Sequence, residues 1–235
     1  MPFTILRNSL SLAIPVLRRN WLLILFLQIP LAVSEFTQEF LGVNDAVQPS
    51  AVAIAIVLPV FFIMSFFSSA LTFAAVQIAE SKGSVLLAEI WESVSPKLGA
   101  LLLASLVVGV ISGIGLVALI LPGLVLMTYF LFVPHTIIAD PPVSLWAVVT
   151  RSKRLAFGHF VLSFLLVLLS FGLSTLLFLL GEQFGTYLGA WGSDEFSRRL
   201  LLLTLRCLFS IAGGGLVDVI ISTYFLTLRR FSEAR

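Results

Sequence analysis

The chain has 235 residues, of which 59% are hydrophobic and 11% are charged, and its mean hydropathy is +1.11. Soluble domains carry about 25% charged residues, so this composition excludes an ordinary soluble domain. The formal net charge of +2 is too small to indicate a nucleic-acid partner, and the single cysteine, Cys207, excludes an internal disulfide.

Long apolar runs predict helices that cross a membrane. The hydrocarbon core of a bilayer is about 30 Å thick, which an α-helix of about 20 residues can span. The runs cover Trp21–Val33, Ala51–Ala79, Leu98–Leu121, Leu124–Ala139, His159–Leu180 and Leu200–Leu228. We therefore predict an all-α, polytopic membrane helical bundle with six transmembrane helices, in a single integral membrane domain of residues 1–235.

Prolines and glycines indicate where the helices bend or end. Pro15 is expected to bend or end the first helical segment, while Pro30 and Pro59 predict kinks inside spans. The pair Pro122-Gly123 predicts the turn between the third and fourth spans. Residues 35–50 and 181–197 are predicted to be loops.

An amphipathic segment precedes each of the three predicted hairpins. These segments are Phe3–Leu17, Ser81–Lys97 and Ser144–Phe157, with Trp21, Trp91 and Trp146 in or beside them. Helices of this kind lie in the membrane interface with the apolar face toward the lipid. We predict interfacial helices on the cytoplasmic face, and a threefold repeat of one such helix plus one hairpin over residues 3–80, 81–140 and 141–230. The alternative is a chance recurrence of amphipathic linkers.

The basic residues predict the orientation in the membrane. With six spans and the N-terminus inside, eleven of the 14 basic residues face the cytoplasm: Arg7, Arg18, Arg19, Lys82, Lys97, Arg151, Lys153, Arg154, Arg229, Arg230 and Arg235. Basic residues in short loops mark the cytoplasmic side, so both termini are predicted to be cytoplasmic. Membrane lipids are expected partners, and candidate headgroup contacts are Arg18, Arg19, Arg151, Lys153 and Arg154.

Polar residues in the sixth span form a candidate intramembrane site. Charge is costly in hydrocarbon, so Arg206 and Asp218 are functional candidates. Gly213, Gly214 and Gly215 precede Asp218, and an unwound helix beside a buried acid is typical of ion or substrate sites in transporters. The alternative is that the glycines permit close packing and that a serine, the backbone or a histidine such as His135 pairs with Asp218.

Small and hydroxyl-bearing residues in other spans favour close helix packing. Ser105, Gly109 and Gly113 recur at every fourth position, which allows contact either within one subunit or in a homo-oligomer. The mid-span serines Ser68 and Ser69 are expected to bond to backbone or neighbouring helices.

Catalytic and cofactor motifs do not occur in the sequence. It contains no phosphate-binding loop, HExxH motif or nucleophile elbow. His135 and His159 are the only histidines and have no local partner at a metal-ligand spacing. We therefore predict neither enzymatic activity, nor a metal, nor a cofactor.

One stretch of about 40 residues resembles a known family. It contains Leu121-Pro122-Gly123, Val133-Pro134, Ala147, Arg151-Ser152, Leu155 and Gly158, and the entry Arg18-Arg19-Asn20-Trp21 agrees with it. The pattern resembles the YciC-like inner-membrane proteins and the related membrane domain of glycerophosphodiester phosphodiesterases. This resemblance implies a bacterial inner-membrane location. It implies no phosphodiesterase activity, because the soluble catalytic domain of those enzymes is missing here.

Two functional hypotheses follow from these patterns. The first is an accessory or membrane-organising protein with a membrane-protein partner. The second is a small transporter or lipid-handling protein that uses the region from Gly213 to Asp218. A water-filled or lipid-sized cavity that reaches Asp218 distinguishes the second hypothesis from the first.

Overall fold

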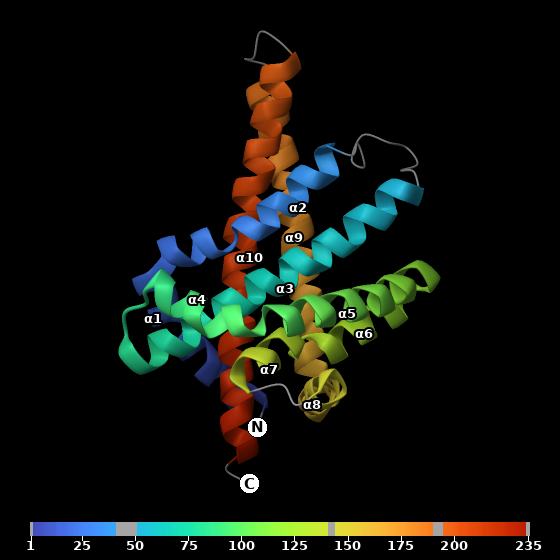
Figure 1. Ribbon diagram of the computed structural model, residues 1–235. Coiled ribbons are helices and arrows are strands. Elements are labelled where there is room, and N and C mark those ends of the chain that lie inside the picture. The colour runs from blue at the N-terminus through green and yellow to red at the C-terminus, as the bar shows by residue number, and fades with distance from the viewer. Residues whose placement is uncertain (1, 41–50, 141–143, 190–194, 234–235) are drawn as a thin grey trace.

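The computed structural model describes residues 2–40, 51–140, 144–189 and 195–233. Over these ranges the chain is helical and contains no strand, which confirms the predicted all-α class (Figure 1). The helices are α1 (Pro2–Leu27), α2 (Ile29–Phe40), α3 (Ala51–Lys82), α4 (Leu87–Val94), the short 3-10 turn η1 (Ser95–Lys97), α5 (Leu98–Ala118), α6 (Ile120–Phe130), α7 (Val133–Ala139), α8 (Leu145–Gly158), α9 (Phe160–Gly189) and α10 (Glu195–Glu233).

Several helical stretches are long and apolar enough to cross a membrane. Five do so alone: Thr4–Gln38, Pro59–Lys82, Leu87–Gly115, Leu121–Ala139 and Leu200–Glu233. A sixth is added if α8 and the first part of α9, which meet at a bend of 101°, count as one span. Among the described residues this gives five to six crossings, so the chain is a multi-pass membrane protein of the predicted kind.

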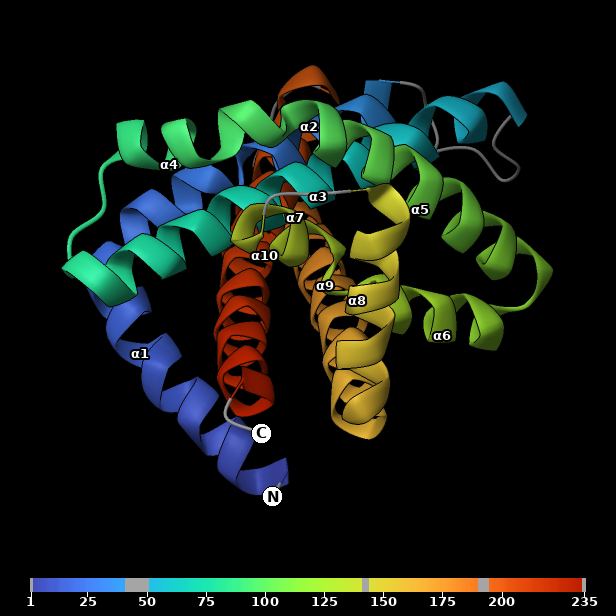
Figure 2. The same cartoon turned by 60° about the horizontal axis from the view of Figure 1, so that its bottom comes forward.

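Two groups of helices make up the fold. Helices α9 and α10 form a long antiparallel pair, and the α2/α3 and α5/α6 pairs cross that pair obliquely (Figures 1 and 2). The start of α1 lies along the end of α10, where the hydroxyl of Ser9 donates to Oγ1 of Thr227 at 3.3 Å. Helix α1 therefore begins on the side of the molecule where α10 ends.

The predicted turn at Pro122-Gly123 is wrong by a few residues. The chain breaks at Leu119, which has extended backbone angles (φ −161°, ψ 130°), and both Pro122 and Gly123 lie in α6. Proline is tolerated in the first turn of a helix because its missing N–H has no helical partner there. A Cβ on Gly115 would lie 3.2 Å from the Cα of Gly123, so these glycines let the two arms of the hairpin approach closely.

The predicted effect of Pro15 is also wrong, whereas a break near Pro30 is present. Helix α1 continues through Pro15 and bends at Asn20, whose backbone is not helical (φ −124°, ψ 22°). The chain breaks again at Gln28, between α1 and α2. Since a proline ring clashes with the carbonyl four residues earlier, Pro30 accounts for a break at this point.

Parts of two predicted loops are helical. Helix α9 continues to Gly189 and α10 starts at Glu195, so residues 181–189 and 195–197 of the loop predicted over 181–197 are helical, and the rest lies outside the described residues. Likewise α2 continues to Phe40, and the rest of the loop predicted over 35–50 lies outside the described residues. In lipid, backbone polar groups must be satisfied within the segment, which favours continued helix even at glycines.

The second predicted interfacial helix is joined to a span. Helix α4, η1 and α5 follow one another as one helical stretch, Leu87–Gly115. On α4, Ile90 and Val94 are fully buried while Trp91 is exposed, so only part of the predicted apolar face packs on the protein. The predicted threefold repeat stays a prediction.

The stripe of small residues on α5 packs inside the chain. A Cβ on Gly109 would lie 3.0 Å from both Cβ and Cγ of Phe62 on α3, and Ser105 is buried. Of the two alternatives for this stripe, the contact supports packing within one subunit.

Ion pairs link the ends of several helices on the side where α10 ends. Asp140, which follows α7, pairs with Arg151 of α8 at 2.6 Å and with Arg229 of α10 at 3.2 Å. Arg230 pairs with Glu80 at the end of α3. These contacts join four helices at the side predicted to be cytoplasmic.

Candidate functional site

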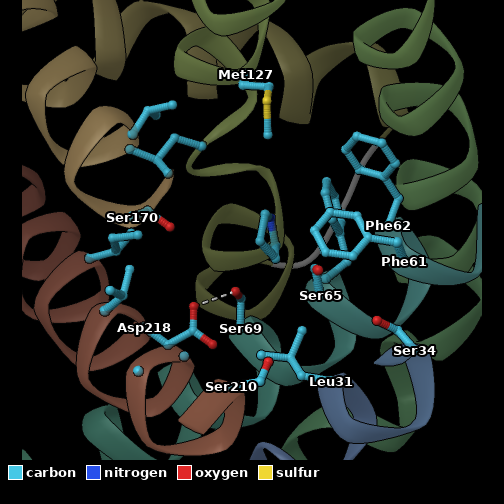
Figure 3. Close-up of a pocket in the computed structure, with 18 of the residues that line it drawn as sticks. Leu31, Ser34, Phe61, Phe62, Ser65, Ser69, Met127, Ser170, Ser210 and Asp218 are labelled. Carbon is cyan, nitrogen blue, oxygen red and sulfur yellow. Dashed lines mark hydrogen bonds between the residues drawn. The ribbon is translucent and has the colours of Figure 1, made fainter. Parts of the chain in front are cut away.

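The helices enclose a cavity of about 330 Å³. Its lining comes from α2, α3, α5, α6, α7, α9 and α10, so both helix groups contribute (Figure 3). On α3 the lining extends from Phe61 to Ser69, and on α10 it extends from Arg206 to Ile221. The cavity therefore lies along the middle turns of α3 and α10.

The lining combines apolar and hydroxyl side chains. Four phenylalanines contribute: Phe61, Phe62, Phe66 and Phe130. Seven hydroxyl-bearing residues also contribute: Ser34, Ser65, Ser69, Ser112, Ser170, Thr175 and Ser210. Figure 3 shows Ser170, Met127, Ser65 and Phe62 around the same space. An amphipathic molecule would find partners for both of its parts.

Asp218 belongs to a polar cluster at one end of the cavity. Its Oδ1 accepts a hydrogen bond from the hydroxyl of Ser69 at 2.7 Å, as drawn in Figure 3. Its Oδ2 accepts from the Gln28 amide at 3.2 Å and from the Ser68 hydroxyl at 3.4 Å. The Gln28 amide also donates to Oγ1 of Thr72 at 2.9 Å. We call Gln28, Ser68, Ser69, Thr72 and Asp218 the floor cluster.

The predicted unwinding at Gly213, Gly214 and Gly215 is absent, because α10 is helical throughout. The glycines instead admit a neighbouring segment. A Cβ on Gly214 would lie 2.6 Å from Cδ1 of Leu31 and 2.9 Å from Oε1 of Gln28. A helical break does lie beside the buried acid, but it is the break at Gln28 in the first span.

The structure brings together four of the six predicted site residues. Asp218, Arg206, Gly213 and Gly214 line the cavity, whereas Gly215 packs against Ile24. Arg206 and Asp218 are 12 positions apart, which is about 18 Å along a helix. They therefore lie at different levels of the cavity.

His135 lies outside the cavity and does not contact Asp218. Its Nε2 is 3.3 Å from Oγ of Ser222, one helical turn beyond Asp218. Its ring packs among Phe73, Phe132 and Phe225, with ring centroids 5.1 to 6.2 Å apart. Asp218 thus has serine partners, as one alternative predicted, but no histidine partner.

Tightly packed residues close the bundle beyond the floor cluster. Phe73, Phe132, Tyr224 and Phe225 are fully buried, and Val219 to Leu228 on α10 are buried almost without interruption. The ion pairs of Asp140 follow at the end of the same half. Access to the cavity from this side is blocked.

The predicted lipid contacts differ in their surroundings. Arg18, Arg19, Lys153 and Arg154 are exposed. Arg151 is half-buried in its ion pair with Asp140. Lys153 lies 5.6 Å from the ring centre of Tyr129.

Gln28 is the functional candidate that the sequence analysis missed. It is fully buried and contacts three members of the floor cluster. A polar amide inside an apolar span, two residues before Pro30, is the signal that could have identified it.

The fold and the cavity define a multi-pass helical membrane protein with a polar site inside its bundle. Comparison of the chain with protein-family models, with curated proteins and with solved structures finds no match. Among the described residues, no group of three or more His, Cys, Asp or Glu side chains is placed so that it could hold a metal ion.

Proposed function

We propose that this chain is a small transporter or lipid-handling protein of the bacterial inner membrane, and that it binds an amphipathic molecule in the cavity. The supporting observation is that the cavity reaches Asp218, a buried carboxylate inside the bundle. An accessory or membrane-organising role would not require such a space, whereas binding of a small molecule does.

The size and lining of the cavity support this proposal. Small-molecule sites are typically about 300–1,000 Å³, mostly apolar, with a few placed polar groups. The cavity of about 330 Å³ is at the lower end of that range. It suits a small amphipathic solute or one part of a lipid, with its polar end near Asp218.

The uneven packing along the bundle supports a role in moving that molecule. The cavity lies at the middle turns of α3, α9 and α10, while aromatic residues and ion pairs close the half predicted to be cytoplasmic. Alternating access requires a site that is open to one side while it is closed to the other. The arrangement supplies the closed side of such a cycle.

Several sequence-based expectations belong to the same proposal. We place both termini in the cytoplasm and, by resemblance, group the chain with the YciC-like inner-membrane proteins. We assign no catalytic residue. An accessory or membrane-organising protein, with a partner or as a homo-oligomer, is the competing outcome of the test below.

The test compares the molecules that copurify with three forms of the full-length protein, by native mass spectrometry in mild detergent. Ser170→Trp places an indole in the cavity, because Ser170 lines it. Leu169→Trp is the matched control, because the neighbouring Leu169 is 54% exposed on the outer surface of the same helix.

We expect a bound molecule on the wild type and on Leu169→Trp, and its loss from Ser170→Trp. Lipidomic and metabolite analysis of the released fraction then distinguishes a lipid from a free solute. A bound molecule that is equally abundant on all three proteins, or absent from all three, would contradict the proposal. Absence from all three would favour the accessory role.

A further inference from the structure

The floor cluster concentrates oxygen atoms around one carboxylate. The Ser68 hydroxyl donates to Oε1 of Gln28 at 2.7 Å and lies 3.3 Å from the carbonyl oxygen of Leu27. Ser69 lies 2.7 Å from Asp218 on the other side. Carboxylate, hydroxyl, amide and carbonyl oxygens are the ligands that hard cations prefer.

The break at Gln28 contributes backbone groups to this cluster. The backbone N–H of Gln28 donates to the backbone carbonyl of Leu25 at 3.1 Å, and the backbone N–H of Leu31 donates to the backbone carbonyl of Gln28 at 2.9 Å. These tighter bonds replace the regular helical pattern at the junction of α1 and α2. The Leu27 carbonyl, which the backbone N–H of Leu31 bypasses, lies 3.3 Å from the Ser68 hydroxyl. In discontinuous membrane helices, backbone carbonyls at such breaks coordinate Na⁺ or H⁺ near the bilayer midplane.

The glycines of α10 explain why the break can lie next to Asp218. A Cβ on Gly214 would overlap Oε1 of Gln28, at 2.9 Å, and a Cβ on Gly215 would lie 3.1 Å from Cγ2 of Ile24. Larger residues at either position would separate the two helices. Glycine at these two positions therefore permits the contact between the break at Gln28 and the helix that carries Asp218.

The charge of the cluster calls for a cation. Asp218 is only 8% exposed, and the donors that the described residues present to it are the neutral side chains of Gln28, Ser68 and Ser69. A buried ionised carboxylate is costly unless a positive charge compensates it. One monovalent cation would neutralise the site, and Ser69 and Asp218 open onto the cavity through which it could enter.

We propose that Asp218, Ser68, Ser69 and Gln28 bind a sodium ion at the floor of the cavity. This inference deepens the proposed function, since the ion would bind beside the molecule held in the cavity. The serine hydroxyls can rotate their protons away and present lone pairs to the ion. These oxygen atoms are hydrogen-bonded to one another at 2.7 to 3.4 Å, so they would have to separate less to surround Na⁺ than to surround the larger K⁺.

The test measures the apparent Tm of the full-length protein in detergent at constant ionic strength and pH, in NaCl, KCl or choline chloride. At about 100 times the Kd, Na⁺ should raise the Tm of the wild type by about 5–10 °C over choline. We expect K⁺ to have a much smaller effect, and Asp218→Asn to remove the response to Na⁺.

A second pair of variants keeps the test decisive if Asp218→Asn does not fold. Ser69→Ala removes one ligand and should weaken the apparent affinity for Na⁺ by about 10-fold, which is about 1.4 kcal/mol. Ser65→Ala is the control, because Ser65 lines the cavity one turn earlier on α3 and is not part of the floor cluster. It should keep the wild-type affinity.

Three results would overturn the sodium site. They are equal stabilisation by all three salts, a response to Na⁺ that survives Asp218→Asn, and equal affinities of Ser69→Ala and Ser65→Ala. A stability that follows pH but not Na⁺ would assign a proton to Asp218 instead. If a molecule copurifies but Na⁺ does not change the Tm, only the sodium site is refuted. If Na⁺ raises the Tm but no molecule copurifies, only the proposed function is refuted.

Discussion

At the scale of single residues, Gln28 contacts three polar side chains, as many as Asp218 does. Its amide nitrogen donates to Thr72 and Asp218, and its amide oxygen accepts from Ser68. Each of these partners is buried. Gln28 therefore combines a structural role with the role of a sodium ligand that we propose for it beside Asp218.

Replacing Gln28 with leucine should destabilise the fold. The side chain keeps a similar volume, but three buried polar groups lose a partner, and each such loss costs about 1–3 kcal/mol. We expect the free energy of unfolding, measured by SDS titration in mixed micelles, to fall by at least about 1 kcal/mol. Gln77→Leu is the matched control, because Gln77 is exposed on α3. Equal stabilities of the two variants would contradict the prediction.

Sequence reasoning identified Asp218 but not its amide partner, for a physical reason. An acid in an apolar run is conspicuous because ionised groups are rare in lipid, and neutral serines nearby suggested hydroxyl partners. A glutamine is less conspicuous, and Gln28 lies 190 positions from Asp218. Their contact depends on how α1 and α2 meet α10, which no local pattern encodes.

At the scale of helices, small residues set the distance between neighbours. Gly109 of α5 faces Phe62 of α3 so closely that a Cβ would lie 3.0 Å from the Cβ and Cγ of that residue. Those atoms are near the backbone of α3, so the helices would have to separate. At Gly99, near the start of α5, a Cβ would meet no other atom within 4 Å.

Gly109→Ala should therefore destabilise the protein, and Gly99→Ala should not. Overpacking of a close contact costs about 1–3 kcal/mol, whereas an unobstructed Gly→Ala change in a helix is neutral or gains up to about 1 kcal/mol. The apparent Tm in detergent measures both variants under one condition. The helix contact would be refuted if Gly109→Ala were as stable as Gly99→Ala.

Helix identity was predictable, while the positions of breaks were not. Apolar length identified the spans, because backbone groups in lipid must bond within their own helix. Breaks depend on competing tertiary contacts. Pro122-Gly123 favours a turn, yet packing of Gly115 against Gly123 moves it to Leu119, and the glycines before Asp218 stay helical because they pack against α1 and α2.

At the scale of the whole molecule, one half of the bundle is packed and the other contains the cavity. The packed half includes the aromatic cluster around His135 and the ion pairs of Asp140, and the floor cluster lies at the boundary between the two halves. A molecule in the cavity could proceed further only if α3, α7 and α10 separated. The two halves thus have the roles of a binding chamber and a closed gate in the function that we propose.

The orientation of these halves can be tested by thiol labelling. In a Cys207→Ser background, which lacks the native cysteine, single cysteines would replace Ser84 and Leu119. Both positions are exposed, and Leu119 lies beyond α5, whose 21 residues extend about 30 Å from Leu98. A membrane-impermeant maleimide should label Leu119→Cys in intact spheroplasts and Ser84→Cys only after permeabilisation.

Ser232→Cys adds a third position near the end of α10. Because Arg230 of α10 pairs with Glu80 of α3, Ser232 lies on the same side as Ser84 and should be labelled only after permeabilisation. Labelling of both serine positions in intact spheroplasts, with Leu119→Cys protected, would invert the predicted orientation. The packed half would then face away from the cytoplasm, and the direction of movement in the proposed function would reverse with it.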